Sequence, residues 1–185
     1  MSRKSGHRFS EQDNAPNNMS DKPYRPNVGI ALFNAQGLEL IARRLKDDGP
    51  EIILPGHDWQ MPQGGIDATE EPLAAARREL YEETGVTSAR YLGETTEWLS
   101  YEFPAYAGPA VNLSRFRGQR QKWFAFAFTG VDSEVEVTAH RSGEEAEFGA
   151  WRWERLALLP GLVVPFKREV YERVVAEFAQ YGARA

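Results

Sequence analysis

The stretch that decides the fold is residues 59–86, WQMPQGGIDATEEPLAAARRELYEETGV. A loop with two consecutive glycines leads into a segment with the apolar spacing of a helix, and glutamates crowd its end. Glu79, Glu82 and Glu83 are three and four residues apart, so they share one helical face, where like charges repel. The arrangement predicts a bound cation, and magnesium or manganese prefers such oxygen ligands. The alternative is a solvated acidic face, the usual meaning of a run of charges.

The flanking residues predict where this helix begins and ends. Thr69 is a suitable N-cap, and Glu70 and Glu71 then lie in the first turn, where the helix dipole favours acids. Gly85 fits the left-handed position that closes a helix. Arg78 lies beside the glutamates and can pair with one that takes no metal. The residues with core-facing spacing are Leu73, Ala76 and Leu80.

The spacing of this stretch resembles the complete signature of the Nudix hydrolases. Five residues separate Gly64 from Glu70, seven more lead to Arg78, and the run RELYEETGV over residues 78–86 follows. The resemblance implies the Nudix fold, an α/β architecture with a mixed β-sheet sandwiched between helices. The residues that it implies as structural parts of the motif are Gly65, Glu70, Arg78 and Gly85.

The resemblance also implies the metal site. Glu79, Glu82 and Glu83 would be catalytic ligands of Mg²⁺, with Mn²⁺ able to substitute and with more than one ion bound. Gly64 would let the backbone approach the ions closely.

A further acid is expected from a loop outside the signature, as a metal ligand or general base. The candidates are Glu144, Glu145 and Glu147. Glu147 is preferred, because AEF-x-x-WRW resembles the segment that carries this acid in the related subfamily. The alternative is a surface carboxylate in an acidic loop.

Composition bounds the class of protein. The chain has 185 residues, no cysteine and a formal net charge of −5. It is long enough for one domain with a proper core, and no apolar run is long enough to span a membrane. The acidic balance argues against a long duplex-binding groove. We expect a cytoplasmic protein with a disordered tail over residues 1–22 and a single Nudix domain over residues 23–185.

Hydrophobic periodicity predicts the remaining elements. A short helix is expected over residues 154–159, and a final helix from Pro165 with an apolar stripe of Val170, Val174 and Phe178. The expected strands cover residues 24–34, 38–45, 51–54, 57–62, 89–103, 121–130, 134–138 and 148–153.

Segments outside the signature resemble two related subfamilies, bacterial RNA 5′ pyrophosphohydrolases and plant-type asymmetric diadenosine tetraphosphate hydrolases. They include YRPNVGI, WQMPQGGI, GQRQKWF and FKREVYERVVAEF. WLSYEFP is more similar to the dinucleotide enzymes, and FKRE to the RNA enzymes. The departures include residues 49–58 and the HRSGEEAEF loop.

The same resemblance implies a substrate pocket that takes a purine base and a polyphosphate. Arg25, Val164, Phe166 and Lys167 would line the base pocket, with Tyr101 near the substrate. Arg44, Gln121 and Lys122 would hold phosphates. The alternatives are core packing for Phe166 and ordinary surface charges for Arg25 and Lys122. A basic patch in a loop, formed by Arg115, Arg117 and Arg120, would attract RNA or polyphosphate, or would simply be solvated.

The favoured function is therefore that of an RNA 5′ pyrophosphohydrolase, which converts a 5′-triphosphate RNA end to a monophosphate and thereby acts in mRNA decay. The alternatives are a diadenosine tetraphosphate hydrolase that yields ATP and AMP, and a non-catalytic nucleotide-sensing module. The expected partner is a triphosphorylated RNA end or a dinucleoside polyphosphate, without membrane or duplex DNA.

Overall fold

The computed structural model describes residues 21–45, 49–109, 111–139, 141 and 145–182. The expected N-terminal tail therefore lies almost wholly outside the described residues, as does Glu144. No helix in the described ranges is both long and apolar enough to cross a membrane.

An eight-stranded mixed sheet forms the centre of the fold. Its main path runs β3-β2-β1-β7-β5, with β4 paired to β1, β6 to β7 and β8 to β2. The two longest strands, β1 and β7, are parallel, and the other pairs are antiparallel. The strands are β1 (Tyr24–Phe33), β2 (Glu39–Arg44), β3 (Trp59–Gln60), β4 (Gln63–Gly65), β5 (Ala89–Glu94), β6 (Leu99–Glu102), β7 (Gly118–Phe128) and β8 (Phe148–Glu154).

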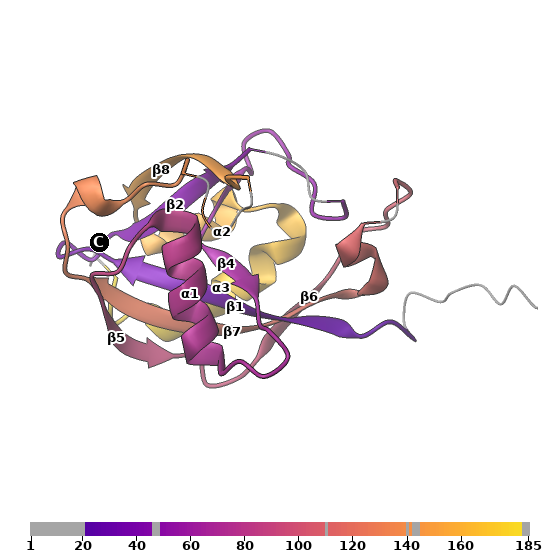
Figure 1. Ribbon diagram of the computed structural model, residues 1–185, viewed down its shortest axis with the longest axis horizontal. Helices are drawn as coiled ribbons and strands as arrows, with labels where there is room; N and C mark the ends of the chain where they lie inside the picture. The colour runs from indigo at the N-terminus through magenta and orange to yellow at the C-terminus, as the bar shows by residue number, and fades with distance from the viewer. Residues whose placement is uncertain (1–20, 46–48, 110, 140, 142–144, 183–185) are drawn as a thin grey trace, which may run out of the picture.

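Helices cover both faces of the sheet. Helix α1 (Pro72–Thr84) crosses one face, and α2 (Leu159–Leu162) and α3 (Arg168–Phe178) lie on the other (Figure 1). Figure 1 also shows the beginning of β1, with β6, extending away from the body of the fold. The expected α/β sandwich with a mixed sheet is confirmed.

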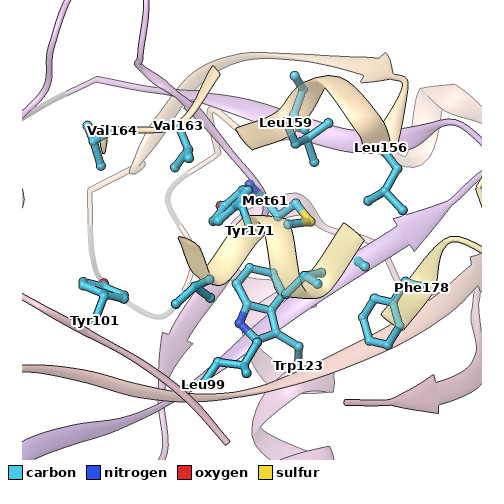
Figure 2. Close-up of a cluster of buried hydrophobic side chains, with 14 of the residues drawn as sticks. Met61, Leu99, Tyr101, Trp123, Leu156, Leu159, Val163, Val164, Tyr171 and Phe178 are labelled. Carbon is cyan, nitrogen blue, oxygen red and sulfur yellow. The ribbon is translucent and has the colours of Figure 1, made fainter. Parts of the chain in front are cut away.

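Strand β7 divides the core in two because its side chains alternate between the faces of the sheet. Phe124 and Phe126 pack on the α1 side. Trp123 packs on the α3 side, where its ring meets that of Tyr171 edge-on at 5.5 Å. Figure 2 shows this second cluster, in which the backbone N–H of Met61 donates a hydrogen bond to the Tyr171 hydroxyl at 3.0 Å.

The ends of the signature helix follow the sequence only in part. Gly85 has φ of +73° and donates its N–H to the carbonyl of Tyr81, so the predicted C-cap is confirmed. The predicted N-cap at Thr69 is wrong, because the helix starts at Pro72 with Glu71 in the cap position and no side-chain cap. Glu70 therefore lies outside the first turn, and its carboxylate accepts hydrogen bonds from Arg78.

Three other predictions are corrected. Residues 51–54 form no strand, because only Glu51 makes an isolated bridge there. The strand expected over residues 134–138 is a 3₁₀ turn, Asp132–Glu134, followed by bends. Glu134 there accepts hydrogen bonds from the N–H groups of Thr87 and Ser88, which ties the chain to the end of α1. The last helix opens with a 3₁₀ turn, Pro165–Lys167, before α3 begins. Further 3₁₀ turns are Asn112–Arg115 and Leu156–Leu158.

Candidate active site

Arg78 connects the glycine loop to the acidic face of α1. Its guanidinium donates hydrogen bonds to Glu70 at 2.8 and 2.9 Å, to Glu79 at 2.8 Å and to Glu82 at 2.9 Å. A further bond at 2.9 Å reaches the carbonyl of Gly65. The bond from Arg78 lowers the pKa of Glu70, and the carboxylates raise the pKa of Arg78. The Arg78 side chain thus fixes the glycine loop and two of the predicted metal ligands, Glu79 and Glu82. We call Glu70, Arg78, Glu79, Glu82 and Glu83 the α1 cluster.

Gly64 lies directly against the carboxyl group of Glu79. A Cβ atom added at Gly64 would overlap that carboxyl group, so a side chain here would force Glu79 to move. Burial raises the pKa of Glu79 to about 7, although Arg78 opposes the shift. The glycine is therefore required by the close approach of loop and carboxylate.

Glu83 and Glu147 lie next to each other in the site. Glu83 accepts a hydrogen bond from the backbone N–H of Gln63 at 3.0 Å. Glu147 accepts one from the Gln60 amide at 3.2 Å and lies 3.7 Å from the Arg44 guanidinium. Burial raises the pKa of Glu83 well above its usual range, and the charge of Glu147 adds to this. Burial also raises the pKa of Glu147, while Arg44 lowers it.

These groups line one cavity of about 710 Å³. The α1 face supplies Glu79, Glu82 and Glu83, and Glu147 comes from the segment before β8. Arg25 and Arg44, two predicted substrate ligands, also line it. The structure therefore brings the predicted acids together with part of the predicted substrate pocket. Glu145, the other acid candidate in the described residues, lines the same cavity.

The donor set fits a divalent cation. Carboxylate oxygens are the ligands that magnesium and manganese prefer, and Gly64 leaves room beside Glu79. Glu83 and Glu147 lie together although burial, and then the charge of Glu147, raise the pKa of Glu83. As the side chains lie, no three His, Cys, Asp or Glu residues in the described ranges form a ready metal cage. Arg78 binds one oxygen each of Glu79 and Glu82.

A second polar group, which we call the buried cluster, comprises Glu51, Gln60, Tyr101, Gln119 and Lys167. It borders the cavity, which Glu51 and Gln119 also line. The carboxylate of Glu51 accepts hydrogen bonds from Tyr101, from Gln119 at 3.0 Å and from Lys167 at 3.0 Å. Lys167 also donates to Gln60 at 3.3 Å. Lys167 is 0% exposed and Glu51 4%.

Electrostatics in the buried cluster are balanced. Burial would raise the pKa of Glu51, but the charges of Lys167 and Arg44 and the bond from Tyr101 bring it below its usual value. Burial lowers the pKa of Lys167, and Glu51 opposes this. Gln60 connects the cluster to Glu147. Arg44 also connects the buried cluster to Glu147, because its guanidinium lies 3.7 Å from Glu147 and donates to the backbone carbonyl of Glu51 at 2.8 Å.

The other predicted substrate residues are less accessible than the sequence implied. Gln121 is fully buried and bonds to Asn27 at 2.9 Å and to Gln119 at 3.1 Å. Val164 is 3% exposed within the α3-side core. Lys122 donates to the Thr95 carbonyl at 2.5 Å and lies 3.2 Å from Glu94. The ring of Phe166 packs 5.6 Å from that of Tyr101.

Sequence reasoning missed Glu51. It lies in residues 49–58, the segment that departs from the family pattern, where it was expected only as part of a short strand. The available signal was a charged residue followed by the apolar run IIL, because a buried carboxylate needs a partner. Nothing in the local sequence identified that partner as Lys167, which is 116 positions away.

Comparison with known proteins agrees with this arrangement. A family model described as NUDIX domain matches residues 23–174. A protein of Rhodopseudomonas palustris (strain BisA53) named RNA pyrophosphohydrolase is 54% identical over 162 residues, which is 88% of this chain and 91% of that protein. One of the same name from Bradyrhizobium diazoefficiens is 55% identical over 159 residues, covering 86% of this chain and 94% of that protein.

Solved structures share the fold. The MutT protein of Methanosarcina mazei Go1 superposes with a TM-score of 0.56 at 20% identity, covering 85% of this chain and 96% of that one. An Ap4A hydrolase of C. elegans gives 0.56 at 18% identity, covering 84% and 98%. With the matched domain and the signature on α1, the chain belongs to the Nudix family.

Proposed function

We propose that this protein is a divalent-metal-dependent RNA 5′ pyrophosphohydrolase, which converts a 5′-triphosphate RNA end to a 5′-monophosphate in the cytoplasm. The observation that carries the proposal is the convergence of Glu79, Glu82, Glu83 and Glu147 on one cavity that Arg25 and Arg44 also line. The relatives named RNA pyrophosphohydrolase, at 54% and 55% identity, support the choice of substrate.

Glu79, Glu82, Glu83 and Glu147 would hold Mg²⁺, or Mn²⁺ in its place, with the Gly64 backbone close by. When bound, the ions supply charge neutralisation on the phosphoryl oxygens and a positioned water. Arg78 keeps Glu79 and Glu82 in place from the side of the loop.

Glu147 is the proposed general base. Gln60 and Arg44 fix its position, and a carboxylate held in place can take a proton from the attacking water. The water oxygen bonds to the α-phosphorus, its proton passes to Glu147, and the bond from that phosphorus to the bridging oxygen breaks with its electron pair on the departing pyrophosphate.

Product analysis tests the proposal directly. Labelled triphosphorylated RNA and diadenosine tetraphosphate are incubated with the enzyme, with and without Mg²⁺. We expect monophosphorylated RNA only with Mg²⁺, and a larger kcat/KM on RNA than on the dinucleotide. A larger kcat/KM on the dinucleotide would assign the protein to the alternative substrate. Nucleotide binding without Mg²⁺-dependent turnover would make it a sensing module.

A further inference from the structure

A second hollow lies where the first residues of β1 and β7 run side by side. It has a volume of about 300 Å³ and is lined by Tyr24, Pro26, Trp98 and Arg120. In β1, side chains alternate between faces, so Tyr24 and Pro26 lie opposite Arg25, which lines the candidate active-site cavity. The two sites are therefore separated by the thickness of one strand.

Aromatic rings and guanidinium groups alternate on this face. The Arg120 guanidinium lies 5.4 Å from the centre of the Trp98 ring, and that of Arg117 lies 4.9 Å from the centre of the Tyr24 ring. Both rings are half-buried, so they are held in place while part of each faces solvent. Flat π surfaces beside fixed cations are what single-stranded nucleic acids use for base stacking.

The charge on this face is positive. Arg117 is paired with Glu102, which also accepts a bond from the Tyr24 hydroxyl at 3.2 Å. Arg120 is exposed, and no ion pair to it is found within the described part of the chain. The whole chain carries a net charge of −5 and its active-site cavity is rich in carboxylates. A long polyanion therefore needs a local positive surface such as this one once it leaves the cavity.

We propose that this hollow binds single-stranded RNA downstream of the 5′ end, with one base stacked on Trp98 and a backbone phosphate at Arg120. The inference rests on the proposed function, because it requires an RNA whose 5′ end occupies the cavity. The strand that leaves the cavity past Arg25 reaches the hollow by crossing β1. Stacking tolerates every base, so the contact adds affinity for RNA without selecting sequence.

The kinetic test compares two triphosphorylated RNAs, of two and of fifteen nucleotides. Trp98→Ala and Arg120→Ala should each raise KM for the longer RNA by about fivefold or more and leave kcat unchanged. A fivefold rise corresponds to about the lower end of the free energy that one base stack contributes. KM for the two-nucleotide RNA should not change. Trp98→Phe should restore most of the affinity, because the ring is kept. Tyr91→Ala and Arg90→Ala, exposed residues of β5, are the matched controls and should leave both values unchanged.

A binding test separates this inference from the proposed function. The affinity of an unphosphorylated, labelled fifteen-nucleotide RNA is measured by fluorescence anisotropy without Mg²⁺, so no turnover is needed. Weaker binding by Trp98→Ala and Arg120→Ala supports the hollow even if the enzyme cleaves no RNA. Unchanged binding together with an unchanged KM ratio between the two RNAs overturns it. An equal rise in KM for both lengths also overturns it, since that marks a general disturbance of the cavity.

Discussion

The α1 cluster and the buried cluster lie side by side but differ in charge balance and in access to solvent. In the α1 cluster one arginine is grouped with four carboxylates, and three of these, Glu79, Glu82 and Glu83, line the cavity. In the buried cluster one carboxylate faces one lysine, and two amides and a phenol complete the hydrogen bonds. The pKa of Glu79 is raised, whereas that of Glu51 is lowered.

The difference indicates that the two clusters have different roles. An excess of carboxylates beside open space is unfavourable without a cation, so it marks a place where a ligand completes the charge. A balanced and fully bonded pair needs no ligand and instead fixes the surrounding backbone. We therefore expect changes in the α1 cluster to alter catalysis, and changes in the buried cluster to alter stability.

The largest expected effect comes from Glu83→Gln. It removes a proposed metal ligand while keeping the shape of the side chain and its bond from Gln63. We expect kcat/KM to fall by roughly a thousandfold, since metal-assisted charge stabilisation is worth several kcal/mol. Steady-state kinetics on triphosphorylated RNA measure this. Glu172→Gln on the exposed side of α3 is the control, and near-normal activity of Glu83→Gln would rule out the assignment.

Next is Glu51→Gln, which leaves the ammonium of Lys167 buried without its counter-charge. Breaking a buried ion pair from one side costs about 3 kcal/mol or more, measured as the free energy of unfolding in urea. The double variant Glu51→Gln/Lys167→Met should regain much of this loss, because the uncompensated charge is gone. If the single and double variants were equally destabilised, the pair would not be coupled and the contrast between the clusters would fail.

Gly64→Ala should have a smaller effect and one confined to the α1 cluster. The added methyl group displaces the carboxyl group of Glu79, so we expect kcat/KM to fall by about tenfold and stability by about 1–2 kcal/mol, as for an overpacked site. Gly161→Ala is the control, because a Cβ there meets nothing within 4 Å. Equal kinetics for the two variants would show that the close approach is not needed.

The smallest expected effect concerns Glu39, a buried acid outside both clusters, whose pKa can be compared with those of Glu79 and Glu51. Glu39 is 0% exposed, accepts a bond from the Leu32 N–H at 2.7 Å, and burial raises its pKa well above the usual value. A carboxyl group with a raised native pKa binds a proton more tightly when folded, so the free energy of unfolding falls as pH rises past the unfolded pKa.

Glu39→Gln removes that fall, since an amide does not titrate in this range. Relative to the wild type, the variant should gain stability as the pH is raised from about 5 to about 8. Urea unfolding of both proteins at the two pH values measures the gain. A difference that does not change with pH would contradict the assigned shift, and would remove the contrast with Glu51, whose counter-charge lowers its pKa.

The sequence predicted what depends on neighbours along the chain. The α1 face, its glycine C-cap and the alternating strands β1 and β7 follow from spacing alone, and the family from the signature. It could not locate the N-terminus of α1, because Glu70 is drawn to Arg78 rather than to the helix end. It also missed the buried cluster, because Glu51 and Lys167 meet only when residues 49–58 fold over the start of α3. That meeting is decided by tertiary packing.

The most direct test of the central claim is a crystal structure with Mn²⁺ and a non-hydrolysable nucleotide, in which anomalous scattering locates the ions. The account predicts manganese among the carboxylates of Glu79, Glu82 and Glu83, with the polyphosphate across it in the cavity. The contrary result is a structure with bound nucleotide but no ion among these carboxylates, which remain bonded only to Arg78 or turn to solvent. That result would contradict the proposed metal site.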